Sequence, residues 1–221
     1  MPVITFASPK GGAGKTTSCL TLATQLAQAA AVTIVDADVN HPIAAWSKLP
    51  NKPEAITVVS DVTEANILDK IEDAAKRDTF VLVDLEGTAS LTAALAISAA
   101  DLVIIPLQAS QLDANQAARA IGQVKQQERV TKRSIPMRIL FTRSSAAIQT
   151  RTARALREEL AENAVACFET QLLEREAFKA MFSFGGPLEL LATNQVSNPA
   201  KAIDNARAYA AEVVAVLKEG A

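Results

Sequence analysis

The chain has 221 residues, of which 49% are hydrophobic and 4% aromatic, so alanine and aliphatic side chains must form its core. Its two cysteines, Cys19 and Cys167, are far apart and form no CxxC pair, which argues against a zinc site, an iron–sulfur cluster and a disulfide scaffold. The net charge of -2 excludes no class of partner by itself. No signal peptide precedes the first apolar run and no run is long enough to span a bilayer, so we expect a cytoplasmic protein with no membrane partner.

Short apolar runs alternate with longer helical patterns along the chain. We expect strands at Val3–Ala7, Val32–Asp36, Ile56–Val59, Phe80–Leu85, Leu102–Leu107, Met137–Thr142 and Val165–Phe168. We expect helices at Lys15–Ala30, Thr63–Arg77, Leu91–Ala99, Ala114–Gln127, Gln149–Glu162 and Pro199–Lys218, and a turn at Phe184–Pro187. Several strand runs are continuously apolar, as in sheets covered on both faces. The pattern predicts a single α/β domain over residues 1–221, with a doubly wound, mostly parallel sheet and helices on both faces.

The first expected strand runs directly into a glycine-rich loop, and a helix follows. The loop reads Ser8-Pro9-Lys10-Gly11-Gly12-Ala13-Gly14-Lys15-Thr16-Thr17, in the strand–loop–helix context of a P-loop. Glycines let backbone N–H groups surround phosphates, and the helix N-terminus adds partial positive charge. Lys15 can reach the β- and γ-phosphates, and the Thr16 hydroxyl can ligate Mg2+. The sequence therefore predicts ATP and Mg2+ as cofactors, bound by Lys10, Gly11, Gly12, Ala13, Gly14, Lys15, Thr16 and Thr17.

One departure from the ordinary P-loop indicates a family. Pro9 stands where the ordinary motif has glycine, and an extra lysine, Lys10, precedes the glycines. In this form the loop resembles the deviant Walker A motif of the ParA/MinD family. The resemblance implies a nucleotide-sandwich homodimer that forms on ATP binding. It also implies that Lys10 reaches across the dimer to the opposite phosphates, supplying charge as an arginine finger does in other NTPases.

Carboxylates at two other strand ends complete the predicted site. Asp36 and Asp38 resemble the family's second motif, although Val39-Asn40 replaces its Pro-Gln. The resemblance implies that Asp38 orients the attacking water and helps organise Mg2+, while Asp36 supports the loop; the alternative for Asp38 is a turn cap. Asp84 ends an apolar strand in a Walker B pattern and is expected to hold Mg2+. Glu86 is either a rival catalytic carboxylate or a helix cap.

Later segments also resemble the family. Thr142 and Arg143 lie where the family places residues near the adenine, which makes them candidates for base contact. Ser183–Pro187 resembles the family's late glycine-containing segment near the dimer and base. The segments Asp36–Pro42 and Glu174–Met181 resemble a ParA-like subgroup linked to conjugative DNA transfer.

A strongly basic segment is concealed by the nearly neutral total. From Arg119 to Arg157 there are ten basic residues and one acidic residue, Glu128, which fits a polyanion-binding surface. The spacing of three between Arg151, Arg154 and Arg157 lets them share one helix face. The alternative is that they pair only with nearby glutamates on the helix surface. The candidates for DNA contact are Arg143, Arg151, Arg154, Arg157, Arg175 and Lys179.

Together these features predict a ParA-type ATPase switch of the small type, in which the chain begins on the first strand. The resemblance implies that ATP builds the dimer, that the dimer binds DNA nonspecifically and associates with the nucleoid, and that a ParB-like or cargo-adaptor protein triggers hydrolysis. One alternative is a MinD-like membrane switch, which would need a basic amphipathic tail. Tyr209–Ala221 holds one lysine, two glutamates and mostly small apolar residues, and so is typical of a docking helix. The other alternative is a metabolic phosphoryl-transfer enzyme, for whose substrate pocket there is no sequence signature.

Overall fold

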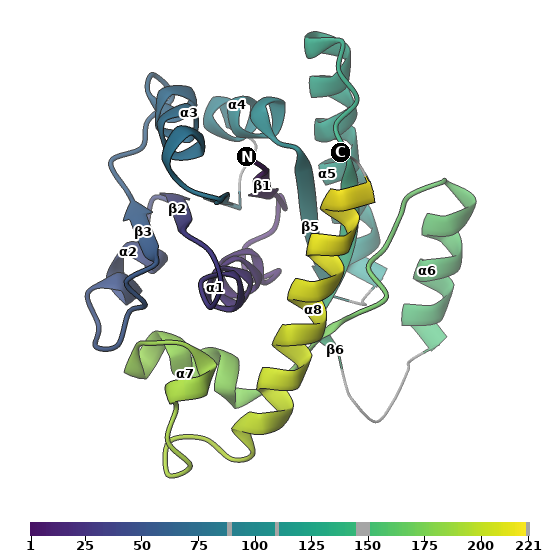
Figure 1. The fold of residues 1–221 in the computed structure, drawn as a ribbon. Coiled ribbons are helices and arrows are strands. Elements are labelled where there is room, and N and C mark those ends of the chain that lie inside the picture. Colours follow the sequence, from purple (N-terminus) through teal and green to yellow (C-terminus); the bar gives the residue numbers. More distant parts are fainter. Residues whose placement is uncertain (88–89, 109–110, 145–150, 220–221) are drawn as a thin grey trace.

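The computed structural model describes residues 1–87, 90–108, 111–144 and 151–219, without the side chains of residues 111–114 (Figure 1). Strands and helices alternate, as predicted. The strands are β1 (Val3–Phe6), β2 (Val32–Ala37), β3 (Ile56–Val59), β4 (Phe80–Leu85), β5 (Leu102–Gln108), β6 (Met137–Ser144) and β7 (Leu172–Leu173). The helices are α1 (Lys15–Leu26), α2 (Pro42–Ser47), α3 (Ile67–Arg77), α4 (Leu91–Ala99), α5 (Gln111–Thr131), α6 (Arg151–Glu162), α7 (Glu176–Phe184), the 3-10 helix η1 (Leu188–Leu190) and α8 (Pro199–Glu219).

The strands form one seven-stranded sheet in the order β3-β2-β4-β1-β5-β6-β7. Each pair of neighbouring strands is parallel. Strand β1 lies between β4 and β5, so the chain winds outward from β1 in both directions. Ligands of such sheets bind beyond the carboxyl ends of the strands at this switch point. The predicted doubly wound α/β fold is confirmed.

Two separate hydrophobic clusters fill the space between the sheet and its helices. Helices α1, α2, α7 and α8 contribute to the first cluster, and α3, α4, α5 and α6 to the second. Ile4 and Phe6 of β1 point into the first cluster, whereas Val3 points into the second. Because both faces of the strands are buried, every position must be apolar or hydrogen-bonded, which explains the continuous apolar runs.

The last strand differs from the prediction. Residues Val165–Phe168 form only an isolated bridge, between Cys167 and Ile139, and the seventh strand is Leu172–Leu173. The apolar character of the expected strand reflects burial instead: Phe168 is fully buried and packs edge-to-face on Tyr209 of α8, with ring centroids 6.0 Å apart. The prediction of this strand was therefore wrong.

Two short helices, α2 and α7, were not predicted, and the six residues of α2 are too few to show a helical period. The expected helix Gln149–Glu162 is described from Arg151 onward, and its first two residues lie outside the described residues. Over the described ranges, the model contains no helix with both the length and the apolar character that a membrane crossing requires.

Candidate nucleotide-binding site

The glycine-rich loop lies at the carboxyl end of β1, directly before α1. Gly12 and Gly14 have φ values of +78° and +101°, in the left-handed region that glycine adopts without strain. Gly14 is the last residue before helix α1, which begins at Lys15. This is the arrangement in which loop and helix N–H groups face an anion.

The Lys15 side chain is held within the loop. It is buried, and its ammonium group donates a hydrogen bond to the Lys10 carbonyl oxygen at 3.3 Å. Burial lowers the pKa of Lys15, while the carboxylates of Asp84, Asp38 and Glu86 oppose this shift. The site thus combines one cation with three acidic groups, as binding of both phosphates and a metal ion requires.

Residues at the ends of three other strands contact the glycine-rich loop. The Thr142 hydroxyl at the end of β6 donates to the Ala13 carbonyl oxygen at 2.7 Å, and the Gln108 amide at the end of β5 donates to the Gly12 carbonyl oxygen at 2.8 Å. Gly87, after β4, approaches so closely that a Cβ there would lie 2.8 Å from the backbone nitrogen of Gly11. Sequence reasoning missed Gln108 and Gly87; their only signal is that Gln108 ends, and Gly87 follows, a strand beside β1.

The Asp84 carboxylate lies buried at the end of β4, next to the phosphate loop. Among the described residues, neither of its oxygens accepts a hydrogen bond of normal geometry. Burial is the main cause that raises its pKa to about 8; Asp36 adds to the rise, and the Thr16 hydroxyl and Lys15 oppose it. A buried carboxylate with unsatisfied oxygens fits a role as a cation ligand.

The remaining donors define what kind of metal fits. In the described part of the chain, no three His, Cys, Asp or Glu side chains are grouped so that they could hold a metal ion alone. Mg2+ commonly takes one or two protein ligands and completes its octahedron with water and substrate phosphates. Asp84 and the hydroxyl of Thr16 therefore fit Mg2+ bound together with a nucleotide.

Asp36 and Asp38 have different environments at the end of β2. Asp36 pairs in register with Asp84, is fully buried, and accepts a hydrogen bond from the Ala44 N–H of α2 at 2.8 Å. Burial raises its pKa. Asp38 is half-buried, and its Oδ1 accepts from the Asn40 backbone N–H at 2.9 Å and side-chain amide at 3.0 Å. Asp38 therefore caps a turn, and Asn40 fixes one of its oxygens.

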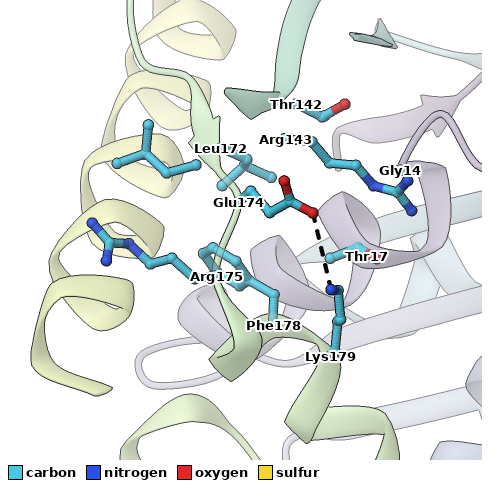
Figure 2. A pocket seen from close by; sticks show the side chains of 10 residues that line it. Gly14, Thr17, Thr142, Arg143, Leu172, Glu174, Arg175, Phe178 and Lys179 are labelled. Atoms are coloured by element: carbon cyan, nitrogen blue, oxygen red, sulfur yellow. Dashed lines mark ion pairs between the residues drawn. The ribbon is translucent and has the colours of Figure 1, made fainter. Parts of the chain in front are cut away.

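A pocket opens beside the start of α1 (Figure 2). Gly14 and Thr17 form one side, and the predicted base-contact residues Thr142 and Arg143 lie above it. Figure 2 shows the Arg143 side chain extending toward Gly14. The remaining wall comes from β7, α7 and their connection: Leu172, Leu173, Glu174, Arg175, Phe178 and Lys179. The buried side chains of Leu172 and Phe178 give this wall an apolar surface suited to a planar ring.

The late glycine pair lies elsewhere. A Cβ on Gly185 would lie 2.4 Å from the Pro50 carbonyl oxygen, and one on Gly186 would lie 3.0 Å from Cβ of Asn51. Both glycines have positive φ, as the predicted turn requires. This segment therefore joins α7 to the turn after α2, and among the described residues it is not part of the pocket wall.

The six basic candidates for DNA contact fall into two groups. Arg143, Arg175 and Lys179 line the pocket, where Lys179 pairs with Glu176 at 2.9 Å and Glu174 at 3.9 Å, the latter pair drawn in Figure 2. The other three lie on α6, where Arg151 and Arg154 are exposed and Arg154 pairs with Glu158 at 3.0 Å.

Arg157 does not share the exposed face of Arg151 and Arg154. Its guanidinium carbon lies 4.4 Å from the ring centroid of Phe141, and one of its terminal nitrogens is buried with no hydrogen-bond partner in the described part of the chain. Three residues advance a helix by only 300°, so the third arginine rotates toward the sheet. The structure thus leaves two of the three α6 arginines facing solvent.

Comparison with known proteins identifies the family. Residues 1–219 match the family described as VirC1 protein. The chain belongs to this family. It is also 40% identical to the protein ParA of Rhizobium radiobacter over 220 residues, which cover 99% of each chain. The predicted membership in the ParA-type P-loop ATPases is confirmed.

Solved structures share the fold. Apo McdA from Cyanothece superposes with a TM-score of 0.75 at 18% identity, covering 93% of this chain and 99% of that chain. A plasmid partition protein from Borrelia burgdorferi B31 bound to AMPPNP superposes with a TM-score of 0.69 at 20% identity, covering 99% of both chains. At such identities the likeness concerns the fold alone.

Proposed function

We propose that this chain is a ParA-type ATPase switch for DNA segregation or cargo positioning. ATP with Mg2+ drives formation of a homodimer, the dimer binds DNA nonspecifically, and a ParB-like or cargo-adaptor protein stimulates hydrolysis. The observation that carries the proposal is the unsatisfied, buried Asp84 carboxylate beside the buried Lys15 of a glycine-rich loop. Both groups are costly to bury alone, and a metal–triphosphate complex satisfies both.

Each residue of the loop has a defined task in nucleotide binding. Lys15 contacts the β- and γ-phosphates, and the backbone N–H groups of Gly11–Thr17 surround them. Thr16 and Asp84 hold Mg2+, and Asp38 helps to organise it. When bound, Mg2+ neutralises charge on the phosphate oxygens. The pocket beside Gly14 takes the base, with Phe178 and Leu172 against its faces and Arg143 at its rim.

Dimerisation depends on Lys10. The Lys10 carbonyl oxygen already accepts a hydrogen bond from Lys15 of its own chain, which fixes the backbone of Lys10. Its side-chain ammonium then contacts the phosphates bound by the second protomer. Because this charge reaches the phosphates only in the dimer, ATP binding and dimer formation are coupled.

For hydrolysis, Asp38 orients the attacking water. Asn40 holds Oδ1 of Asp38 from two sides, and Oδ2 accepts the hydrogen bond of the water. Glu86, half-buried and close enough to influence Lys15, is the second carboxylate in reach. Because a switch must wait for its partner, basal turnover is slow until the partner protein binds.

DNA binding uses the exposed cations Arg151, Arg154 and Arg143. A dimer doubles the number of phosphate contacts, so ATP gates binding without any base-specific element.

The membrane alternative is less well supported. Helix α8 buries Ala202, Ala206, Tyr209, Ala210 and Val213 in the core, which leaves it docked on its own chain rather than on a bilayer.

Titration calorimetry with ATP and Mg2+ tests the nucleotide site. Lys15→Ala removes the phosphate-facing charge and should abolish binding, whereas Lys201→Ala, an exposed lysine on α8, should bind as the unchanged protein does. Equal ATP affinity of Lys15→Ala and the unchanged protein would refute the assignment.

Light scattering and DNA titration test the switch. Asp38→Ala should bind ATP, hydrolyse it poorly and accumulate as dimer; a monomer at saturating ATP would contradict the dimer proposal. With ATP, affinity for two unrelated duplexes should be similar and should fall steeply with salt. Absence of ATP-dependent binding at low salt would contradict the DNA proposal while leaving the ATPase assignment intact.

A further inference from the structure

A groove lies at the end of the sheet opposite the phosphate loop. Its walls come from the residues before β1, the starts of β4 and β5, the segment before β6, and the last turns of α8. Figure 1 shows both chain termini at this end of the molecule. The apolar part of the lining includes Met1, Phe80, Leu102, Val214 and Leu217. With a volume of about 850 Å³, the groove is large enough for several side chains.

A cluster of four cations adjoins this groove. Lys125, Arg129, Lys132 and Arg133, at the end of α5 and just beyond it, are all exposed and surround one depression. Arg133 and Ser134 line both the depression and the groove, so the two form one continuous surface, here called the groove–cluster surface.

Ion pairs among the described residues neutralise little of this positive charge. The single acid in the cluster, Glu128, is engaged by backbone, since its Oε1 accepts from the Ile135 N–H at 2.8 Å. Arg133 has Asp101 at 3.7 Å. Within the described ranges, no ion pair closer than 4.0 Å involves Lys125, Arg129 or Lys132.

The backbone at Lys132 adds an independent observation. Lys132 follows the last residue of α5 with φ of +53°, in the left-handed conformation in which helices usually place glycine. A lysine at this position costs stability relative to glycine, and it adds a fourth cation to the cluster.

We propose that the groove–cluster surface binds an acidic amphipathic segment of a partner protein. Apolar side chains of that segment enter the groove, and its carboxylates contact the cluster. A DNA duplex matches the charge alone, because it has no apolar side chains to fill a groove formed by Val214 and Leu217. The surface lies at the opposite edge of the sheet from Lys15, so it can be occupied with or without nucleotide. Binding of such a segment is separate from the proposed switch and depends on neither ATP nor DNA.

Selection from a phage-displayed library of random dodecapeptides on the full-length protein tests this proposal. Recovered peptides should combine Asp or Glu with Leu, Ile or Phe. Labelled with fluorescein and measured by anisotropy, they should lose about tenfold in affinity for the triple variant Lys125→Glu, Arg129→Glu, Lys132→Glu. Leu217→Ala should weaken the same peptides, which separates groove binding from charge attraction.

Two further variants keep the test independent of folding and of net charge. Lys132→Gly removes one cation and relieves the left-handed strain, so it should weaken peptide binding without lowering the unfolding temperature. Lys201→Glu changes an exposed charge near the other end of α8 and should leave binding unchanged. The proposal is overturned if no acidic peptides are enriched, or if the triple variant binds them as well as the unchanged protein does. It is also overturned if a short DNA duplex binds this surface and displaces the peptides.

Discussion

The Thr142 hydroxyl donates a hydrogen bond to the Ala13 carbonyl oxygen at 2.7 Å and so ties the end of β6 to the phosphate loop. Thr142→Val keeps the shape of the side chain but leaves the buried carbonyl oxygen without this donor, at a cost of about 1 kcal/mol. We expect ATP affinity to fall about fivefold. Calorimetry checks this, with Thr142→Ser as the control that retains the hydroxyl. A loss of ATP affinity in Thr142→Ser with none in Thr142→Val would show that the methyl group, not the hydrogen bond, matters.

Gly87 should tolerate no side chain. A Cβ there would lie 2.8 Å from the backbone nitrogen of Gly11 and 3.1 Å from the carbonyl carbon of Lys10, and backbone at that distance must move. Gly87→Ala should therefore displace the loop and weaken ATP binding by more than tenfold. The matched control is Gly122→Ala on α5, where a Cβ meets nothing within 4 Å. That change should leave ATP binding intact and stabilise the helix by about 1 kcal/mol.

The buried Asp84 makes stability depend on pH. Its pKa is raised from 3.8 to about 8 in the folded chain, so between these values the folded state binds a proton that the unfolded state lacks. The free energy of unfolding should therefore fall as pH rises from about 4 to about 8. Asp84→Asn should remove this contribution. In thermal unfolding with EDTA and without nucleotide, the stability of Asp84→Asn relative to the unchanged protein should increase as pH rises through this range. If the difference in stability between the two proteins does not change with pH, the raised pKa of Asp84 is contradicted.

The arginines of α6 should separate into two kinds. Arg157→Ala loses the contact with the Phe141 ring and should destabilise the fold by about 1 kcal/mol, with the salt dependence of DNA binding unchanged. Arg151→Ala should change stability by less than about 0.5 kcal/mol. If Arg151 contacts a phosphate, its loss should reduce the log–log salt slope by about 0.9. Chemical denaturation measures the stability of both variants, and salt titration measures the salt dependence of their DNA binding. If Arg157→Ala flattened the log–log salt slope, Arg157 would be a DNA-contact residue instead.

Local patterns in the sequence were sufficient for the fold class and for the strand–loop–helix arrangement of the glycine-rich loop. Continuous apolar runs predicted the buried parallel strands, and glycine spacing before Lys15 predicted the phosphate loop, because both depend on conformational preferences of adjacent residues. Asp36 and Asp84 were each predicted at a strand end, and only the structure shows that their strands pair in register. The seventh strand was misplaced because burial of Phe168 by α8 produces the same apolar pattern as a strand.

What only the tertiary structure decided are contacts between segments far apart in the chain. The support of the loop by Gln108, Thr142 and Gly87 depends on the strand order. This order places the carboxyl ends of β4, β5 and β6 near that of β1. The inward turn of Arg157 depends on the ring of Phe141, which no helical spacing reveals. The groove–cluster surface likewise joins residues from both termini to the end of α5. A sequence records which side chains are present, but shared positions in space follow from how the strands pair and the helices pack.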